Sequence, residues 1–239
     1  MAAQLELMLF THDADLARKA EASGIDRIVV DFENREKIHR QSGHGLEINQ
    51  ATLADLKKVR AAIKIPILVR VNPIFNGSRE EIHSVVGEGA DIIMLPMFRT
   101  MMEVDTFINI SGDTVKKSLL FETKASVTLA QELAPLSFDE YYIGLNDMAI
   151  DFQLPSAFDV LKLDVISRIR NAIPHRRFGF GGITIVGKGE PLKSTEIMDV
   201  MAQKGCTLAI LRRAFKRDVC GRSMEVEVKK IRDYYVEEV

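Results

Sequence analysis

The chain has 239 residues, a length that suits one large α/β domain with a sizeable core. Hydrophobic residues make up 46% of it, charged residues 28%, and the formal net charge is −2, so nothing in the composition favours nucleic acid or a membrane surface as a partner. Two cysteines are too few for a disulfide framework, and the N-terminus has no basic region followed by a long apolar run. We therefore expect a cytoplasmic protein.

Short strand-like runs alternate with amphipathic helical patterns along the whole chain. In chain order, the expected strands are residues 5–10, 27–32, 66–71, 91–96, 118–122, 141–145, 177–182 and 207–211. Helical patterns lie near 13–23, 50–63, 79–88, 100–110, 124–134, 158–173, 194–204 and 221–237. Eight such units are typical of a (β/α)8 TIM barrel, so residues 1–239 should form one domain. A doubly wound open sheet is the alternative, because periodicity alone does not show that a sheet closes.

Two acidic residues follow neighbouring strands near the middle of the chain. Glu122 ends the apolar run 119–121, and Asp147 comes soon after the run 141–143. The residues between them, 125–133, are apolar at helical spacing, so the strands should be parallel and end at the same rim. Two carboxylates at one rim are suitable ligands for a divalent cation. The alternative is two unrelated acids, one of which caps the next helix.

Other polar residues should lie at the same rim, because TIM barrels carry their chemistry on the loops that follow the strands. They are His12, Asp31, Glu33, Arg70, Asn72, Arg99 and the glycine-rich stretch 179–182. Arg70 ends an otherwise apolar strand, where an unpaired guanidinium would be costly. Its planar fork suits a carboxylate or a phosphate, and the alternative is an ion pair with Asp31 or Glu33. So many acids around one arginine also favour a bound cation.

Several segments in these positions resemble the HpcH/HpaI aldolase and citrate lyase family. They are Val30-Asp31-Phe32-Glu33, Leu68-Val69-Arg70-Val71-Asn72-Pro73, Gly89-Ala90-Asp91 with Met94-Leu95-Pro96, Phe121-Glu122-Thr123, and Ile143-Gly144-Leu145-Asn146-Asp147 with Met148-Ala149-Ile150-Asp151. They occur in the family's order and span residues 5–215. The resemblance implies a modified TIM barrel in which Glu122 and Asp147 hold Mg²⁺, Mn²⁺ or Co²⁺. It also implies that Arg70 contacts a pyruvate-like keto acid.

The activity that the resemblance implies is that of a carbon–carbon lyase. A class II-type aldolase would cleave or form a 2-keto-acid aldol through a metal-stabilised pyruvate enolate, with an aldehyde or acyl compound as co-substrate. Backbone N–H groups at Gly144, Leu145 and Asn146 would orient the carboxylate, because Asp147 leads into a helix start. The resemblance further implies a homo-oligomer, a trimer or hexamer. The helix at 221–237 could then pack on a neighbouring subunit through its stripe of Met224, Val228 and Ile231.

The sequence departs from the aldolase branch at Asn34, where that branch has a histidine tied to proton transfer. An amide cannot act as a general base near neutral pH. The loop that follows contains His39 and His44, and His44 is favoured because Gly43 and Gly45 would let the backbone fold it over the site. The candidate catalytic residues are therefore Arg70, His44 and Asp31. Solvent or a neighbouring subunit is the competing source of a base.

Two other functions fit the same residues. The first is a citrate-lyase-like acyl lyase on an activated or phosphorylated substrate, with the glycines at 179–182 and the loop containing Lys188 gripping a phosphate. Those glycines would equally serve close packing. The second is a non-catalytic barrel that binds a keto acid without turning it over, suggested by Asn34. Exchange of pyruvate methyl protons with D2O would separate a lyase from a binder.

Overall fold

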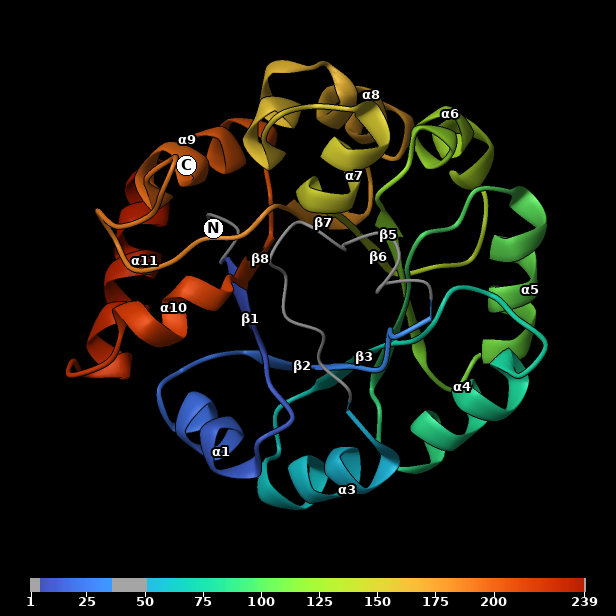
Figure 1. Cartoon of the computed structure of the whole chain (residues 1–239), viewed down its shortest axis with the longest axis horizontal. Helices are drawn as coiled ribbons and strands as arrows, with labels where there is room; N and C mark the ends of the chain where they lie inside the picture. Colours follow the sequence, from blue (N-terminus) through green and yellow to red (C-terminus); the bar gives the residue numbers. More distant parts are fainter. Residues whose placement is uncertain (1–4, 36–50, 239) are drawn as a thin grey trace.

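The computed structural model describes residues 5–35 and 51–238, and these form a barrel of eight parallel strands. The strands are β1 (Glu6–Phe10), β2 (Arg27–Asp31), β3 (Ile67–Arg70), β4 (Ile92–Leu95), β5 (Lys116–Phe121), β6 (Glu140–Ile143), β7 (Arg177–Phe180) and β8 (Leu208–Leu211). Their order around the sheet is β7-β6-β5-β4-β3-β2-β1-β8. Figure 1 shows the barrel end-on, surrounded by its helices. The expected TIM barrel is thus confirmed, and the open sheet is excluded by the closure described below.

The helices follow the strands in the expected alternation. They are α1 (Ala14–Ala22), α3 (Leu53–Ala62), α4 (Ser78–Gly87), α5 (Met101–Ser111), α6 (Lys124–Leu133), α7 (Leu145–Phe152), the 3-10 helix η1 (Ala157–Lys162), α8 (Val165–Ala172), α9 (Ser194–Lys204), α10 (Arg213–Asp218) and α11 (Met224–Glu238). The sequence analysis expected a helix start at Asp147 but not the bounds of α7, and it did not predict α10. The single helix expected at 158–173 is divided into η1 and α8, because the backbone leaves the helix at Leu163.

Threonines start three of the helices by the same device. The side chains of Thr52, Thr100 and Thr123 each accept a hydrogen bond from the backbone N–H three residues on, and the side chain there bonds back to the threonine N–H. Such capping boxes satisfy backbone donors that the first helical turn leaves open. They therefore fix where the chain turns from the rim into α3, α5 and α6.

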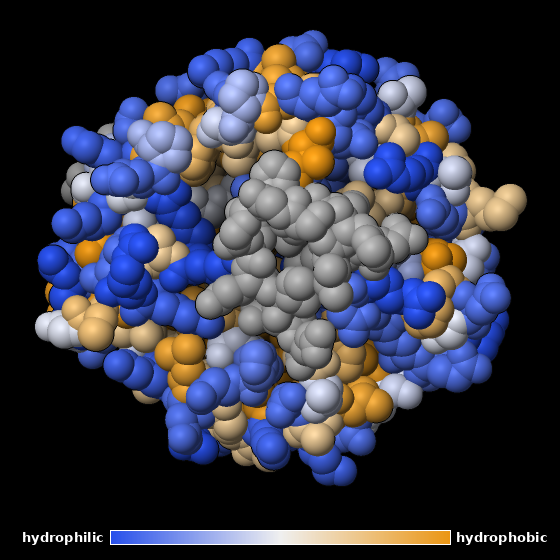
Figure 2. All heavy atoms as spheres, in the orientation of Figure 1, coloured by the Kyte–Doolittle hydropathy of each residue, from blue (hydrophilic) through white to orange (hydrophobic). Residues whose placement is uncertain are grey.

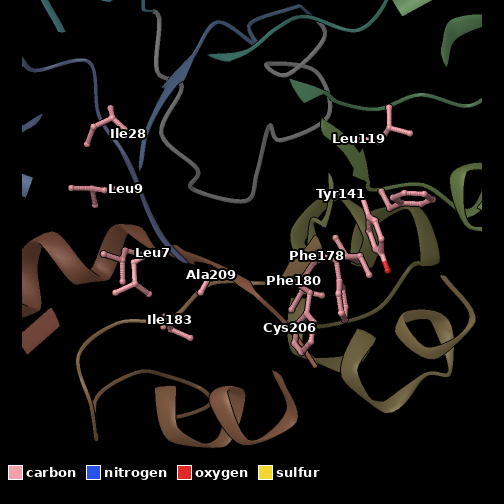
Figure 3. Close-up of a cluster of buried hydrophobic side chains, with 14 of the residues drawn as sticks. Leu7, Leu9, Ile28, Leu119, Tyr141, Phe178, Phe180, Ile183, Cys206 and Ala209 are labelled. Carbon is pink, nitrogen blue, oxygen red and sulfur yellow. The ribbon is translucent and has the colours of Figure 1, made fainter. Parts of the chain in front are cut away.

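Two apolar layers hold the barrel together. A small inner cluster fills the barrel and consists of Met8, Val29, Leu68, Ile92, Met94, Leu120, Tyr142 and Leu208. A much larger cluster lies between the strands and the helices, and Figure 3 shows part of it, including Tyr141, Phe178 and Cys206. Tyr141 stacks on Phe178 with ring centroids 5.2 Å apart. Successive side chains of β6 thus face opposite layers, as strand geometry requires.

The barrel closes between β7 and β8 without a continuous ladder. Hydrogen bonds join the two strands below and above the gap, from Thr207 N to Phe178 O at 2.9 Å and from Ile183 N to Ile210 O at 2.9 Å. Between them, the hydroxyl of Tyr142 accepts from Ile210 N at 2.8 Å and donates to Gly181 O at 2.9 Å. A side chain from inside the barrel therefore replaces the missing backbone pairing.

The last helix packs on its own chain. Met224, Val228 and Ile231, the stripe that was expected to meet a neighbouring subunit, are at most 3% exposed within this single chain, and Tyr235 joins them. The Tyr235 hydroxyl donates to Cys206 O at 2.7 Å. That expectation is therefore wrong for this stripe, because α11 uses it to cover α9 and the outer core. Among the described residues, no helix is both long and apolar enough to cross a membrane.

An ion-pair network lies at the amino ends of the strands, opposite the rim. We call Glu6, Arg27, Glu140 and Arg177 the bottom network. Arg27 is 3% exposed and pairs with both Glu140 and Glu6, and Arg177 reaches Glu6 from the barrel edge. Two guanidinium groups here face two carboxylates, so the buried charges of the bottom network balance.

Candidate active site

Four buried carboxylates and one arginine lie at the end of the barrel where the strands finish. We call Asp31, Glu33, Arg70, Glu122 and Asp147 the rim cluster. Asp31 and Arg70 end β2 and β3 and are partners in the strand register, and the acids are between 1% and 7% exposed. The sequence expected all five at this rim, and the barrel brings them there from four strands. Among the described residues, the cluster thus contains four carboxylates and one guanidinium.

Arg70 forms ion pairs with Asp31 and Glu33, the alternative role that the sequence analysis gave it. Its Nε and Nη2 donate to the two carboxylate oxygens of Asp31 at 2.9 and 2.8 Å, and its Nη1 lies 3.2 Å from Glu33 Oε2. Burial lowers the pKa of Arg70, but the charges of Asp31, Glu33 and Glu122 outweigh burial and hold that pKa well above its ordinary value. Because Glu122 acts on Arg70 as well, the guanidinium electrostatically links the β2, β3 and β5 ends.

Glu122 is held rigidly by the residues around it. Thr123 caps α6 and donates its hydroxyl to Phe98 O at 3.1 Å, which fixes the chain directly after the carboxylate. On the other side, a Cβ atom at Gly144 would lie 2.5 Å from Glu122 Oε1. A side chain at Gly144 would displace the carboxylate, so the glycine provides the space that Glu122 occupies.

Asp147 lies on a helix and not at a strand end. Strand β6 stops at Ile143, Gly144 caps α7 without a side-chain hydrogen bond, and Asp147 is the third residue of that helix. Gly144 N donates to Phe121 O at 3.0 Å, so this N–H belongs to the sheet. The backbone donors that open α7 are those of Leu145 and Asn146, beside the Glu122 carboxylate. A helix start of this kind binds anions.

Asn72 clamps the chain where it leaves β2, with help from a residue that the sequence analysis did not identify. Its Oδ1 accepts from the backbone N–H groups of Asn34 and Arg35 at 3.0 Å each, and its Nδ2 donates to Phe32 O at 3.1 Å. The missed residue is Glu81, which accepts from Asn72 Nδ2 at 2.8 Å and whose pKa burial raises. The only sign of Glu81 in the sequence is its place in the first turn of α4, where an acid is equally typical of an exposed surface.

The histidines do not enter the rim cluster within the described part of the chain. His12 follows β1 but is exposed, and the neighbouring Asp13 caps α1 in its place. His39 and His44 lie outside the described residues. Arg99 is half-exposed and sits 3.5 Å from Asp151. The candidate general base, His44, is thus not among the described residues.

The donor set of the rim cluster suits a hard divalent cation. Carboxylate oxygens are the ligands that such ions take in proteins. Across residues 5–35 and 51–238, no group of three His, Cys, Asp or Glu side chains forms a complete metal site. Glu122 and Asp147 would therefore supply two ligands and leave positions for water and substrate, as Mg²⁺ sites commonly do.

Comparison with known proteins extends the fold assignment. The sequence matches no protein-family model and no curated protein. The HpcH/HpaI aldolase of Desulfitobacterium hafniense DCB-2 is similar in structure, with a TM-score of 0.70 and 12% identity over 92% of each chain. A variant of the citrate synthase SbnG has a TM-score of 0.64 and 16% identity over 96% of each chain. Macrophomate synthase has a TM-score of 0.64 and 14% identity, over 92% of this chain and 82% of its own. At these identities the likeness establishes a shared fold, the one that the sequence resemblance implied.

Proposed function

We propose that this protein is a metal-dependent carbon–carbon lyase that cleaves or forms a 2-keto-acid aldol, with pyruvate or a close analogue as the keto fragment and an aldehyde as the other. The observation that supports this most is the rim cluster, in which four buried carboxylates and one arginine lie at the carboxyl end of the barrel. The fold shared with an HpcH/HpaI aldolase favours the same activity. We further propose a cytoplasmic homo-oligomer, a trimer or hexamer.

Glu122 and Asp147 are the proposed ligands of a divalent cation, Mg²⁺, Mn²⁺ or Co²⁺. When bound, such a cation supplies Lewis-acid stabilisation for negative charge on a keto oxygen. Gly144 keeps Glu122 in place for this role by leaving it room.

Arg70 is the proposed contact for the keto acid itself. Asp31 and Glu33 use only some of its N–H groups, so others remain to donate to a substrate oxygen. Asp31 holds the planar fork in one orientation, which pre-organises it for a carboxylate or keto oxygen. The N–H groups of Leu145 and Asn146, in the first turn of α7, are the proposed donors to the substrate carboxylate.

The proposed general base is His44, outside the described residues, because an aldol cleavage needs a proton acceptor and Asn34 cannot be one. An unperturbed histidine is largely neutral, and therefore competent, at pH 7. His44→Ala should lower turnover by about 10²–10⁴-fold and leave metal affinity unchanged. Full turnover in that variant would assign the role to solvent or to a neighbouring subunit.

The decisive experiment is isotope exchange of pyruvate in D2O, followed by proton NMR. With Mg²⁺, Mn²⁺ or Co²⁺ present, the methyl protons should exchange, and chelation should stop the exchange. Glu122→Ala should abolish it, whereas Asp105→Ala, which removes an exposed acid of α5, should not. Binding of pyruvate without exchange would favour a non-catalytic keto-acid-binding barrel. Exchange without turnover of any aldehyde would favour an acyl lyase.

A further inference from the structure

Arg212 is a second arginine at the carboxyl end of the barrel, and none of the chemistry above uses it. It follows β8 directly and is the residue before α10. The sequence analysis did not place it among the strand-end residues. Its position between β8 and the loop that follows β7 is one where TIM barrels often bind anions.

The guanidinium of Arg212 is enclosed by two loops. Its Cζ lies 5.8 Å from the ring centroid of Phe158 in η1, and its Nη2 lies 3.5 Å from Leu192 O in the loop after β7. Gly189 of the same loop approaches so closely that any Cβ there would collide with Nη2. The loop is thus shaped around the charged group, which is half-buried.

This charge has no carboxylate partner among the described residues. Asp218, the acid that acts on it, is bonded to Thr184 Oγ1 at 2.8 Å and to Arg217 at 3.2 Å. The Nε atom of Arg212 is buried and makes no hydrogen bond within the described part of the chain. Burial lowers the pKa of Arg212, the charge of Asp218 raises it and that of Arg217 lowers it. A buried donor and a desolvated charge left unmatched are costly unless a ligand completes them.

Arg212 is connected to the rim cluster through two glycines. A Cβ atom at Gly182 would lie 3.0 Å from Arg212 Cβ, and one at Gly181 would lie 2.8 Å from Leu145 Cδ1. Leu145 in turn follows Gly144, which covers the Glu122 carboxylate. Figure 2 shows strongly hydrophilic side chains over α10, next to the barrel mouth. A molecule that reaches outward from the rim cluster over these glycines would meet Arg212.

We propose that Arg212 binds the anionic end, carboxylate or phosphate, of the co-substrate that reacts with the keto acid. The site takes an oxyanion because a guanidinium supplies N–H donors and a charge, and within the described part of the chain no carboxylate forms an ion pair with it. The identity of the ligand as a co-substrate rests on the proposed lyase function. The presence of the oxyanion site does not.

Binding of simple anions tests the site independently of activity. Inorganic phosphate and glutarate are titrated separately, by calorimetry with a chelator present, into the native protein, Arg212→Gln and Arg217→Gln. At least one anion should bind the native protein, and Arg212→Gln should weaken it by about 10–100-fold, the value of a charge-assisted pair. Arg217→Gln removes an equal charge from the exposed face of α10 and should change affinity less than about twofold. The anion that binds identifies phosphate or carboxylate as the natural group.

No binding by the native protein, or equal weakening in both variants, would overturn the proposal. If Arg212→Gln does not fold, Arg212→Lys, which keeps the charge, replaces it in the anion titration. It should retain part of the affinity.

Paired aldehydes test the role in catalysis. Condensation with pyruvate is compared for pentanal and 5-oxopentanoate, and for glyceraldehyde and its phosphate ester. Arg212→Gln should raise the KM of the anionic member of one pair by about 10–100-fold and leave the neutral member and pyruvate exchange unchanged. Equal loss for both members would reject Arg212 as the anion contact. If the native protein does not exchange pyruvate, the lyase function fails, and the anion titration still decides the site.

Discussion

The two ends of the barrel carry networks of charged side chains that differ in the residues they bring together. In the bottom network two guanidinium groups meet two carboxylates. In the rim cluster one guanidinium meets four carboxylates. The bottom network pairs its charges within the chain, so it contributes mainly to folding. The rim cluster lies at the end where TIM barrels carry their chemistry, so the same residue types indicate stability at one end and function at the other.

The largest effect should come from removing a proposed metal ligand. Glu122→Ala and Asp147→Ala should each abolish calorimetric binding of Mn²⁺ and all lyase turnover, because neither carboxylate alone suffices to hold the ion. Each variant should still fold, which a cooperative urea unfolding transition will show. Undiminished metal affinity in both variants would show that the site has been placed wrongly.

Removing an acid from the bottom network should lower stability and leave metal affinity unchanged. Glu140→Ala leaves Arg27 buried without its main partner, so the free energy of unfolding should fall by about 3–5 kcal/mol in urea titrations. Metal affinity should be unchanged. The double variant Arg27→Met/Glu140→Leu should recover most of the loss, because it removes both charges together. A stable Glu140→Ala protein would contradict the contrast between the two ends.

Arg70→Lys separates the two roles of an arginine that belongs to both an ion pair and a substrate contact. Lysine keeps the charge but loses the fork, so pyruvate affinity should weaken by about 1–3 kcal/mol and metal affinity much less. Calorimetry measures both. Normal pyruvate binding in a variant that melts far lower would show that Arg70 serves only to pair Asp31 and Glu33.

The smallest effect should come from the exposed edge of the bottom network. Arg177 is 46% exposed in its side chain, so Arg177→Ala should cost at most about 1 kcal/mol of unfolding free energy. Measured beside Glu140→Ala, it tests whether burial, and not the number of ion pairs, sets the contribution of this network.

The sequence was sufficient for the barrel because every strand carries its own apolar run, and a period of two or of 3.6 is a local property. The rim acids were also predictable, since Asp31 and Glu122 come at the ends of those runs. The start of the short helix α7 was placed too late, at Asp147, because Gly144 opens the helix without a capping side chain and the apolar run of β6 continues into Leu145. In the structure Asp147 is the third residue of that helix.

Residues whose role depends on a distant partner could not be predicted. Glu81 supports Asn72 from another element, and nothing in its own segment indicates this. The burial of Met224 and Ile231 in the same chain likewise depends on how α11 lies over α9. Arg212 was overlooked because it stands among exposed cations in Leu211-Arg212-Arg213, and only the folded loop distinguishes it from them.

The hydroxyl of Tyr142 affects where the barrel should open locally. Most neighbouring strands are joined by ladders of backbone bonds, which open only when a strand detaches. The junction of β7 and β8 relies instead on one phenolic oxygen and three backbone bonds that form no continuous ladder. The Ile210 amide should therefore exchange with solvent deuterium through local opening, at a lower free energy than amides in the β2–β3 pair. The pairing of β7 with β8 should therefore be the least stable in the barrel. Sub-global unfolding should begin there, beside the loop that encloses Arg212.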